Sequence, residues 1–269
     1  MWTDAAYRTE PNLVVPLQRL DGTPVVVKAV RADVLEPGEY AGERDALRHY
    51  AALRLPADVR AERLLAADDE LRVLELERVT GSRLDTGWPD ARDDAEVMAD
   101  IARAMRSLWA APAIDAAWRE LALWMQALDA PVAGIDAAVL ARARDLGREL
   151  QQGAVRIVLH ADLHHENIFR QADGALVVID PKGILGAPGF DLGAALWNPW
   201  GRVLSHPRAD RLMATRIDVL AAELAMDRAE VQAWGWVVAI LSAAWLAESD
   251  TDPAYPLGVA GLIDPVAMW

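Results

Sequence analysis

A polar segment, His160 to Asn167 (HADLHHEN), lies between a short apolar run and a predicted hairpin. The run Val155–Leu159 before it is typical of a buried strand, and Asp173-Gly174 is a hairpin turn signal. Asp180 directly follows the second arm of that hairpin. Because cross-strand neighbours lie only about 5 Å apart, we expect the hairpin to bring Asn167 and Asp180 together.

Lysine is rare in this chain. Only two of its 27 lysine and arginine residues are lysines, Lys28 and Lys182. Lys28 ends a run of three valines, and Lys182 stands two positions after Asp180. The sequence therefore strongly favours arginine over lysine. A lysine in such a composition is either accidental or has a role that arginine cannot fill. A strand lysine, the pair Asp162 and Asn167, and a second aspartate after a hairpin form a phosphoryl-transfer arrangement of the protein-kinase type.

Each of these groups has a chemical role in such a transfer. Magnesium prefers hard oxygen ligands, which the Asp180 carboxylate and the Asn167 amide oxygen offer. Asp162 would face the acceptor hydroxyl, orient it and accept its proton. We expect His160 to brace the loop rather than react, and His164 to lie near the γ-phosphate.

Lys28 is the predicted phosphate anchor. Its compact ammonium suits the α- and β-phosphates better than a planar guanidinium, and Glu43 on the following predicted helix is its best carboxylate partner. Taken alone, Lys28 fits an edge-strand residue that keeps its charge in solvent better than a phosphate anchor. The downstream residues reverse that preference. Where an apolar strand opens at the segment after residue 76, Glu77 and Val79 would offer main-chain groups to an adenine ring.

The chain divides into two predicted parts of different character. Residues 1–80 favour a small antiparallel sheet with one helix and bind the nucleotide, and residues 81–269 favour a larger helical lobe that binds the acceptor, with a hinge near residues 77–81. The fold class is α+β. The expected strands and helices are Leu13–Leu20, Thr23–Val30, Glu39–Leu53, Arg63–Ala66, Leu71–Glu77, Asp93–Trp109, Ala116–Leu128, Asp136–Gln152, Val155–Leu159, Asn167–Arg170, Ala175–Ile179, Arg208–Leu224 and Asp227–Ala247.

These motifs resemble a known family. The segment His160 to Asn167, followed by Ile179-Asp180-Pro181-Lys182-Gly183, is similar to the aminoglycoside phosphotransferase family, especially its streptomycin 6-kinase and hydroxyurea phosphotransferase branch. Further matches are Leu76-Glu77-Arg78, Pro188-Gly189-Phe190-Asp191 and Trp197-Asn198-Pro199, and the resemblance covers roughly residues 11 to 250.

The resemblance implies a protein-kinase-like two-lobed fold, ATP and Mg²⁺ as cofactors, and a small-molecule hydroxyl as acceptor, as in streptomycin resistance. It makes Asp162 the base, Asn167 and Asp180 the metal ligands, and Asp191 a structural residue. Relatives carry an additional strand before Leu13–Leu20, whereas here Met1 to Asn12 alone precede it and contain no glycine. We therefore expect that strand to be absent, the loop that covers the phosphates to be short, glycine-free or missing, and ATP to bind weakly.

Composition limits the partners. The net charge of −14 opposes nucleic-acid binding and permits a cationic acceptor, although acidic surfaces also simply keep proteins soluble. The chain has no cysteine, and its start lacks the pattern of a signal peptide, which fits a cytoplasmic location. The apolar stretch 231–247 is flanked by acids rather than by basic clusters, so we expect a buried helix and no membrane partner.

Other functions remain open at this point. His160, Asp162, His164 and His165 include ligand types of a zinc or two-metal hydrolase. That reading leaves Lys28 and the segment after Asp180 unexplained. A kinase-fold protein that binds without catalysis is a second alternative, supported only by the short N-terminal stretch. Hydroxyurea and other metabolite alcohols are alternative acceptors.

Overall fold

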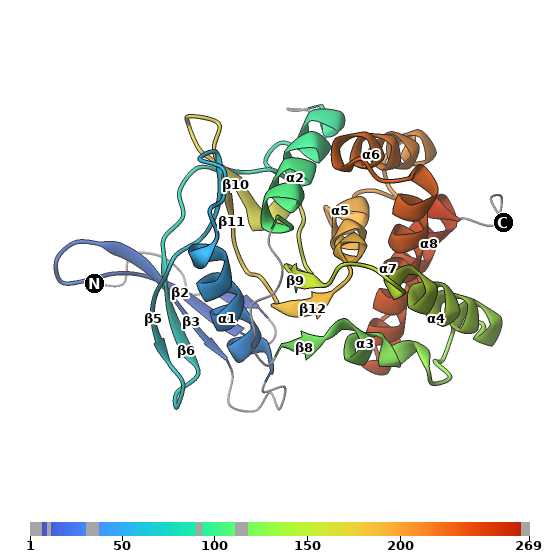
Figure 1. Ribbon diagram of the computed structural model, residues 1–269, viewed down its shortest axis with the longest axis horizontal. Coiled ribbons are helices and arrows are strands. Elements are labelled where there is room, and N and C mark those ends of the chain that lie inside the picture. The colour runs from blue at the N-terminus through green and yellow to red at the C-terminus, as the bar shows by residue number, and fades with distance from the viewer. Residues whose placement is uncertain (1–6, 10–11, 31–37, 90–92, 111–117, 265–269) are drawn as a thin grey trace.

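The computed structural model describes residues 7–9, 12–30, 38–89, 93–110 and 118–264. A sheet-rich part and a larger helical part lie side by side (Figure 1). The strands are β1 (Tyr7–Thr9), β2 (Asn12–Gln18), β3 (Pro24–Val30), β4 (Val59–Ala61), β5 (Leu64–Asp68), β6 (Val73–Glu77), β7 (Ser82–Arg83), β8 (Arg119–Glu120), β9 (Ile157–Leu159), β10 (Ile168–Arg170), β11 (Leu176–Val178) and β12 (Ile184–Gly186).

The helices follow in the same numbering. The α-helices are α1 (Gly38–Ala52), α2 (Asp94–Leu108), α3 (Leu121–Trp124), α4 (Ala137–Gln151), α5 (Leu192–Trp197), α6 (Ala209–Leu224), α7 (Arg228–Glu248) and α8 (Ala254–Ile263). Three short 3₁₀ helices are η1 (Met125–Leu128), η2 (His165–Asn167) and η3 (Pro188–Asp191).

The sheet-rich part is an antiparallel sheet in the order β1-β2-β3-β6-β5. The predicted Asp21-Gly22 turn joins β2 to β3, with Gly22 at φ 87° and the Thr23 amide donating to the Asp21 carboxylate. On β3, Lys28 alternates onto the same face as Val26 and Val30, which pack with α1. Lys28 is thus a charged residue on an apolar face, and its ammonium needs a buried partner.

One expectation about the N-terminal stretch was wrong. β1 pairs with β2, with Tyr7 opposite Val14 and Thr9 opposite Asn12, so the strand that we expected to be missing is present. Antiparallel strands need only a short connection, so few residues are enough for this pairing. The prediction about the phosphate-covering loop falls on residues of Met1 to Asn12 that lie outside the described ones.

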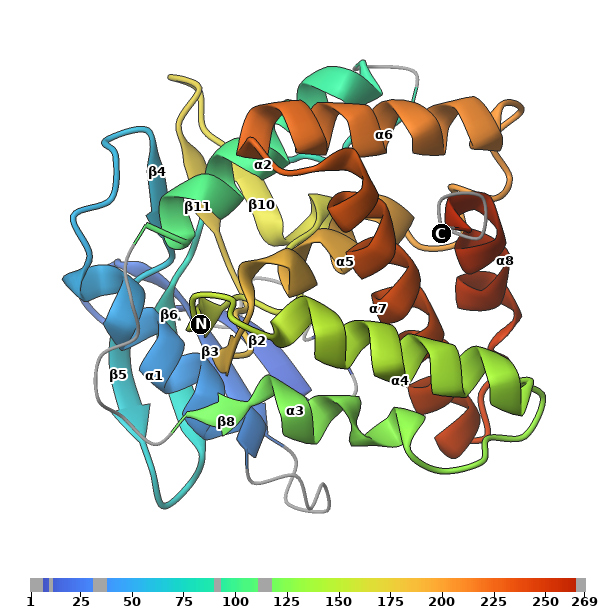
Figure 2. The ribbon, with the colours of Figure 1, turned by 45° about the vertical axis from the view of Figure 1, so that its right-hand side comes forward.

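A second sheet joins the two parts of the chain. Its order is β4-β11-β10-β7, and β4 pairs in parallel with β11. In Figure 2 the labelled strands β4, β11 and β10 lie next to one another, near α2. β4 comes from the first eighty residues, whereas β10 and β11 form the predicted hairpin after Asn167. A third sheet has the order β8-β12-β9. The domain boundary at residue 80 therefore stays a prediction, because a strand from each side of it contributes to one sheet.

The helical part is built around α7, whose residues are buried from Val231 to Ala244 with one interruption. α7 is long and apolar enough to cross a membrane, but 72% of its most apolar window is buried inside the protein. The predicted N-caps Asp136 and Asp227 accept hydrogen bonds from Ala138 and Ala229. The predicted helix Ala116–Leu128 is present only in its second part, as α3 and η1. It was wrong at Arg119–Glu120, which forms β8 because it pairs with β12.

Candidate active site

Lys28 is a buried cation between two carboxylates. Its ammonium lies 2.7 Å from Oε2 of Glu43 on α1 and also pairs with Oδ1 of Asp180. The side chains of Lys28 and Glu43 are 9% and 7% exposed. Burial alone would lower the pKa of Lys28, but Glu43 and Asp180 outweigh it and raise that pKa well above its usual value. Lys28 is therefore charged at physiological pH.

The loop that follows β9 begins with a left-handed residue. Ala161 has φ 64°, and its N–H donates to Oδ1 of Asp191 at 2.6 Å. The other oxygen of Asp191 accepts from the indole of Trp109 at 2.9 Å. A non-glycine residue in this region costs about 1–2 kcal/mol, so the buried Asp191 holds a backbone shape that would otherwise relax. Burial raises the pKa of Asp191 to about 6. Asp191 thus contacts the loop backbone and the indole of Trp109, which are the contacts of a structural residue.

His160 connects the loop to the hairpin. Its Nε2 lies 2.8 Å from the carbonyl oxygen of Ile179, and its Nδ1 accepts from the amide of Asp162 at 3.2 Å. The amide of Lys182 donates to the carbonyl oxygen of His160 at 2.8 Å. Burial lowers the pKa of His160 to about 3, so the ring is neutral. His160 is a brace between two segments.

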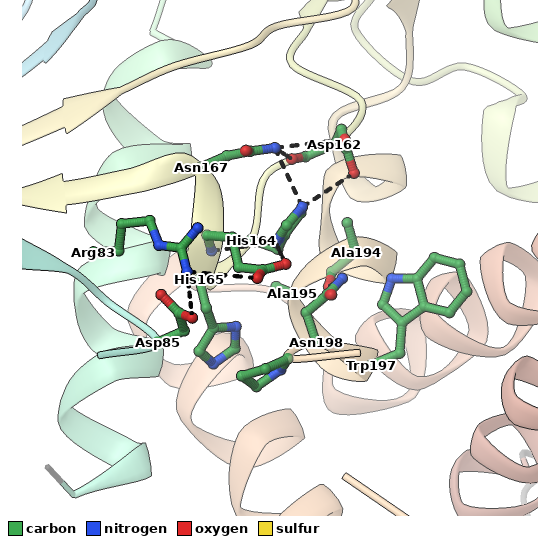
Figure 3. Close-up of polar contacts among 12 residues, drawn as sticks. Arg83, Asp85, Asp162, His164, His165, Asn167, Ala194, Ala195, Trp197 and Asn198 are labelled. Atoms are coloured by element: carbon green, nitrogen blue, oxygen red, sulfur yellow. Dashed lines mark hydrogen bonds and ion pairs between the residues drawn. The ribbon is translucent and has the colours of Figure 1, made fainter. Parts of the chain in front are cut away.

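Asp162, His164 and Asn167 face one another across the loop (Figure 3). The amide nitrogen of Asn167 donates to the carbonyl oxygen of Asp162 at 2.9 Å and lies 3.2 Å from Nε2 of His164. Nε2 of His164 lies 3.5 Å from Oδ1 of Asp162. The Asp162 side chain is 35% exposed, so its carboxylate is accessible from the solvent while its backbone is held in place.

The β10–β11 hairpin brings Asn167 and Asp180 to the same end. Ile168 pairs with Val178, and the amide of Ile179 donates to the carbonyl oxygen of Asn167 at 2.9 Å. Asp180 follows with φ 60°, and its amide donates to Oε1 of Glu62 at 2.8 Å. The two predicted metal ligands therefore flank the last paired residues of one hairpin.

Lys182 also belongs to this cluster, although no site role was predicted for it. Its ammonium lies 3.0 Å from Oδ2 of Asp180 and 3.8 Å from Oδ2 of Asp162. Burial opposes the charged form of Asp180, but Lys182 and Lys28 outweigh it and hold the Asp180 pKa well below its usual value. Two signals in the sequence marked this residue: the rarity of lysine and its place in the segment Asp180-Pro181-Lys182-Gly183.

The cluster fits a magnesium ion. The amide nitrogen of Asn167 is turned toward Asp162, and none of the described residues donates to its Oδ1, so an oxygen of the kind that Mg²⁺ accepts is left over. Two lysines, Lys28 and Lys182, pair with three carboxylates, those of Glu43, Asp162 and Asp180. The carboxylates of this cluster thus outnumber its ammonium groups by one. In the described part of the chain no three histidine or acidic side chains form a metal cage. Mg²⁺ needs none, because it binds through one or two carboxylates and substrate phosphates.

Glu77 and Val79 lie where the two parts of the chain meet. The Glu77 carboxylate pairs with Arg60 and accepts from the Arg63 amide at 2.8 Å, and its own amide donates to the Arg63 carbonyl oxygen at 3.0 Å. The Glu77 amide is thus already used within the protein. Among the described residues, none forms a hydrogen bond with the main chain of Val79, which follows β6 and is half-buried between two exposed residues.

Glu62 is a buried acid that sequence reasoning missed. It is 7% exposed, and burial, reinforced by the neighbouring Glu43, raises its pKa to about 8. At neutral pH it is therefore mostly protonated, and its Oε1 supports the strained backbone of Asp180. Nothing near Glu62 in the sequence marks it, because its partners come from α1 and from the residue after β11.

The four candidate ligands of a metallohydrolase do not converge. The ring of His160 bonds the Ile179 carbonyl, and His165 is fully buried 3.4 Å from an arginine nitrogen, Nη2 of Arg216. Only His164 lies beside Asp162. A zinc site at these side chains would require imidazoles that point to one centre, so the hydrolase alternative loses its ligand set.

Comparisons with known proteins agree with this geometry. Residues 4–250 match the model of a family described as aminoglycoside/hydroxyurea antibiotic resistance kinase. Streptomycin 6-kinase of Streptomyces griseus is 30% identical over 93% of this chain and 80% of its own length. Hydroxyurea phosphotransferase of Kitasatospora aureofaciens is 31% identical over 91% of this chain and 68% of its own length.

A solved structure shows the same fold. Amicoumacin kinase hAmiN, in complex with AMP-PNP, Ca²⁺ and Ami, superimposes with a TM-score of 0.64 at 15% identity, over 97% of this chain and 87% of the other. The predicted protein-kinase-like two-lobed fold, with an antiparallel sheet before a helical part, is confirmed.

Proposed function

Because the chain belongs to the aminoglycoside/hydroxyurea antibiotic resistance kinase family, and is therefore a small-molecule ATP-dependent phosphotransferase, we propose that its acceptor is an aminoglycoside such as streptomycin. The 30% identity to a streptomycin 6-kinase over most of both chains supports this acceptor. The net charge of −14 also favours a cationic acceptor over an anionic one.

Four groups to which we assign roles in the transfer lie near one end of the β10–β11 hairpin, and this arrangement carries the proposal. They are Lys28, Asp162, Asn167 and Asp180. Asp162 would accept the proton of the acceptor hydroxyl. The oxygen of that hydroxyl then bonds to the γ-phosphorus, while the bond from this phosphorus to the β,γ-bridging oxygen breaks and ADP leaves with the electron pair.

The remaining groups would bind the nucleotide. Lys28, fixed by Glu43, would contact the α- and β-phosphates, and the main chain near Val79 would receive the adenine. Asp180 and Asn167 would hold Mg²⁺, which when bound neutralises charge on the phosphate oxygens. His164, beside Asp162, would lie near the γ-phosphate. The enzyme would work in the cytoplasm, where ATP is present, on acceptors that reach that compartment.

Hydroxyurea is the second candidate acceptor. A hydroxyurea phosphotransferase is 31% identical to the chain, about as similar as the streptomycin kinase. Both acceptors offer a hydroxyl to Asp162, and they differ in size and charge. A purified-enzyme assay separates them directly.

The test is ADP release from MgATP, measured by a coupled assay with streptomycin, other aminoglycosides, hydroxyurea and metabolite alcohols. We expect turnover with streptomycin, and a product whose phosphorylated position is assigned by NMR. Asp162→Asn should lose roughly 10²–10⁴-fold in rate while retaining nucleotide binding. Faster turnover of hydroxyurea would replace the acceptor that we propose, and nucleotide binding without any acceptor-dependent turnover would favour the non-catalytic alternative.

A further inference from the structure

Lys182 has a backbone that is fixed from two sides. Its amide donates to the His160 carbonyl oxygen at 2.8 Å, which ties it to the loop that carries Asp162. Its carbonyl lies against α1, where a Cβ on Gly42 would overlap the carbonyl oxygen of Lys182. The neighbouring Gly183 has φ 64°, and a Cβ on it would overlap the carbonyl oxygen of Gly42 in the same way. The side chain of Lys182 therefore leaves from a position that cannot shift easily.

The Lys182 ammonium lies between the two acids with different proposed roles. It is 3.0 Å from Oδ2 of Asp180 and 3.8 Å from Oδ2 of Asp162, and its side chain is 20% exposed. Lys28 pairs with the other oxygen of Asp180 and with Glu43, and among the ion pairs of the described residues none links Lys28 to Asp162. The order along the cluster is thus Lys28, Asp180, Lys182, Asp162.

This order assigns different phosphates to the two lysines. Lys28 is the more buried of the two lysines. Its second partner, Glu43, lies on α1, in the sheet-rich part of the protein. Lys182 adjoins the base, so it stands beside the place where the γ-phosphorus must lie for its new bond to the acceptor oxygen. During transfer, negative charge spreads over the three equatorial oxygens of that phosphoryl group, and a nearby cation stabilises it.

We propose that Lys182 is a second phosphate-binding cation that contacts the γ-phosphoryl group during transfer, separate from Lys28 on the α- and β-phosphates. This inference rests on the proposed function of the site as an ATP-dependent kinase. In the proposed transfer, Asp162 takes the proton of the acceptor hydroxyl and ADP leaves with the electron pair. Lys182 stays protonated throughout and neither takes nor gives a proton. Lysine suits this place because a single ammonium fits between two carboxylates, whereas a guanidinium fork is wider.

The experiment compares two nucleotides that differ in the γ-phosphate. Titration calorimetry with Mg²⁺ measures the Kd of ADP and of AMP-PNP for the wild type, Lys182→Met and Lys182→Arg. We expect Lys182→Met to weaken AMP-PNP about 10-fold and ADP less than about 2-fold, because one charge-assisted contact is lost with the γ-phosphate alone. The kcat should fall about 100-fold. Lys182→Arg, which keeps the charge, should recover part of both losses.

ADP binding also serves as the folding control, because a variant that binds ADP as the wild type does has kept its nucleotide site. Equal weakening of ADP and AMP-PNP by Lys182→Met would overturn the inference and make Lys182 a structural partner of Asp180. Unchanged AMP-PNP affinity and kcat would overturn it as well. A wild-type protein that binds neither nucleotide would instead contradict the proposed function, and the inference with it.

Discussion

Gly42 packs so closely on Lys182 that its α-carbon leaves no room for a side chain. A Cβ at Gly42 would overlap the carbonyl oxygen of Lys182, a main-chain atom that cannot rotate away. The next residue on α1 is Glu43, the partner of Lys28. The helix that carries Glu43 and the segment that carries Asp180 are therefore in direct backbone contact.

The contact makes an unusual prediction for Gly42→Ala. In an exposed helix interior this change stabilises a protein by about 1 kcal/mol. Here it should destabilise the protein and weaken nucleotide binding, because α1 must move away from Lys182 and take Glu43 with it. Thermal unfolding and the Kd of ADP measure both effects. Gly261→Ala on α8 is the matched control, since a Cβ there meets no atom within 4 Å. Equal stabilisation by the two changes would show that α1 has room to adjust.

Glu43→Gln tests the buried ion pair. The ammonium of Lys28 would keep only Asp180 as an anionic partner, and the loss of a buried charge partner should loosen its position. We expect the KM for ATP to rise about 10-fold or more, with a smaller effect on the KM for the acceptor. Glu39→Gln, on the same helix but not among the described ion-pair partners of Lys28, is the control and should leave both constants unchanged. A normal KM for ATP in Glu43→Gln would exclude the pair from nucleotide binding.

Arg216 is a fully buried arginine that links α2 to the end of α5, and its Nη2 lies 3.4 Å from Nε2 of His165. Its guanidinium binds both oxygens of Asp94 at 2.6 and 2.9 Å and donates to the carbonyl oxygens of Leu196 and Asn198. Arg216→Met should cost about 3–5 kcal/mol in the free energy of urea unfolding, because Asp94 loses its partner. Arg228→Met removes an exposed pair with Asp218 and should cost under about 1 kcal/mol. Similar losses for both variants would contradict the importance of burial.

His160 gives the fold a defined pH dependence. The folded-state pKa of about 3 lies below the ordinary value of 6.5, so folding favours the neutral ring. The corresponding stability is complete above pH 6.5 and is lost as the pH falls toward 3, by up to about 5 kcal/mol. Protonation would point a second N–H at the amide of Asp162. Urea unfolding between about pH 7 and pH 4 should show a smaller slope with pH for His160→Gln. An identical slope would assign the acid lability to other groups.

Local signals predicted much of this fold. The Asp21-Gly22 hairpin, the strands near Arg63–Ala66 and Leu71–Glu77, and the caps Asp136 and Asp227 all follow from short-range chemistry and are present. The helix predicted over 116–128 was wrong at Arg119–Glu120, because β8 is set by pairing with β12, far along the chain, whereas the local pattern correctly favoured helix from Leu121 onward. Helices α5 and α8 were also not predicted.

The site was predictable to the extent that one hairpin builds it. Asn167 and Asp180 lie thirteen positions apart and are joined by a local turn, so their proximity could be expected from the sequence. The contacts of Glu62 and Lys182 depend instead on how α1, β4 and the hairpin pack in three dimensions. No periodicity or spacing records such packing. The roles of all these residues in catalysis stay predictions for the experiments above.

The parallel pairing of β4 with β11 limits how the two parts of the enzyme can move. The chain crosses once after Glu77, and a second connection is the β4 ladder, extended by the Glu62 amide donating to the Val178 carbonyl oxygen at 2.8 Å. The backbone contact of Gly42 with Lys182 is a third link. Because the β4 ladder and this contact both end within two residues of Asp180, opening for nucleotide exchange should displace the far edge of the sheet more than Asp180.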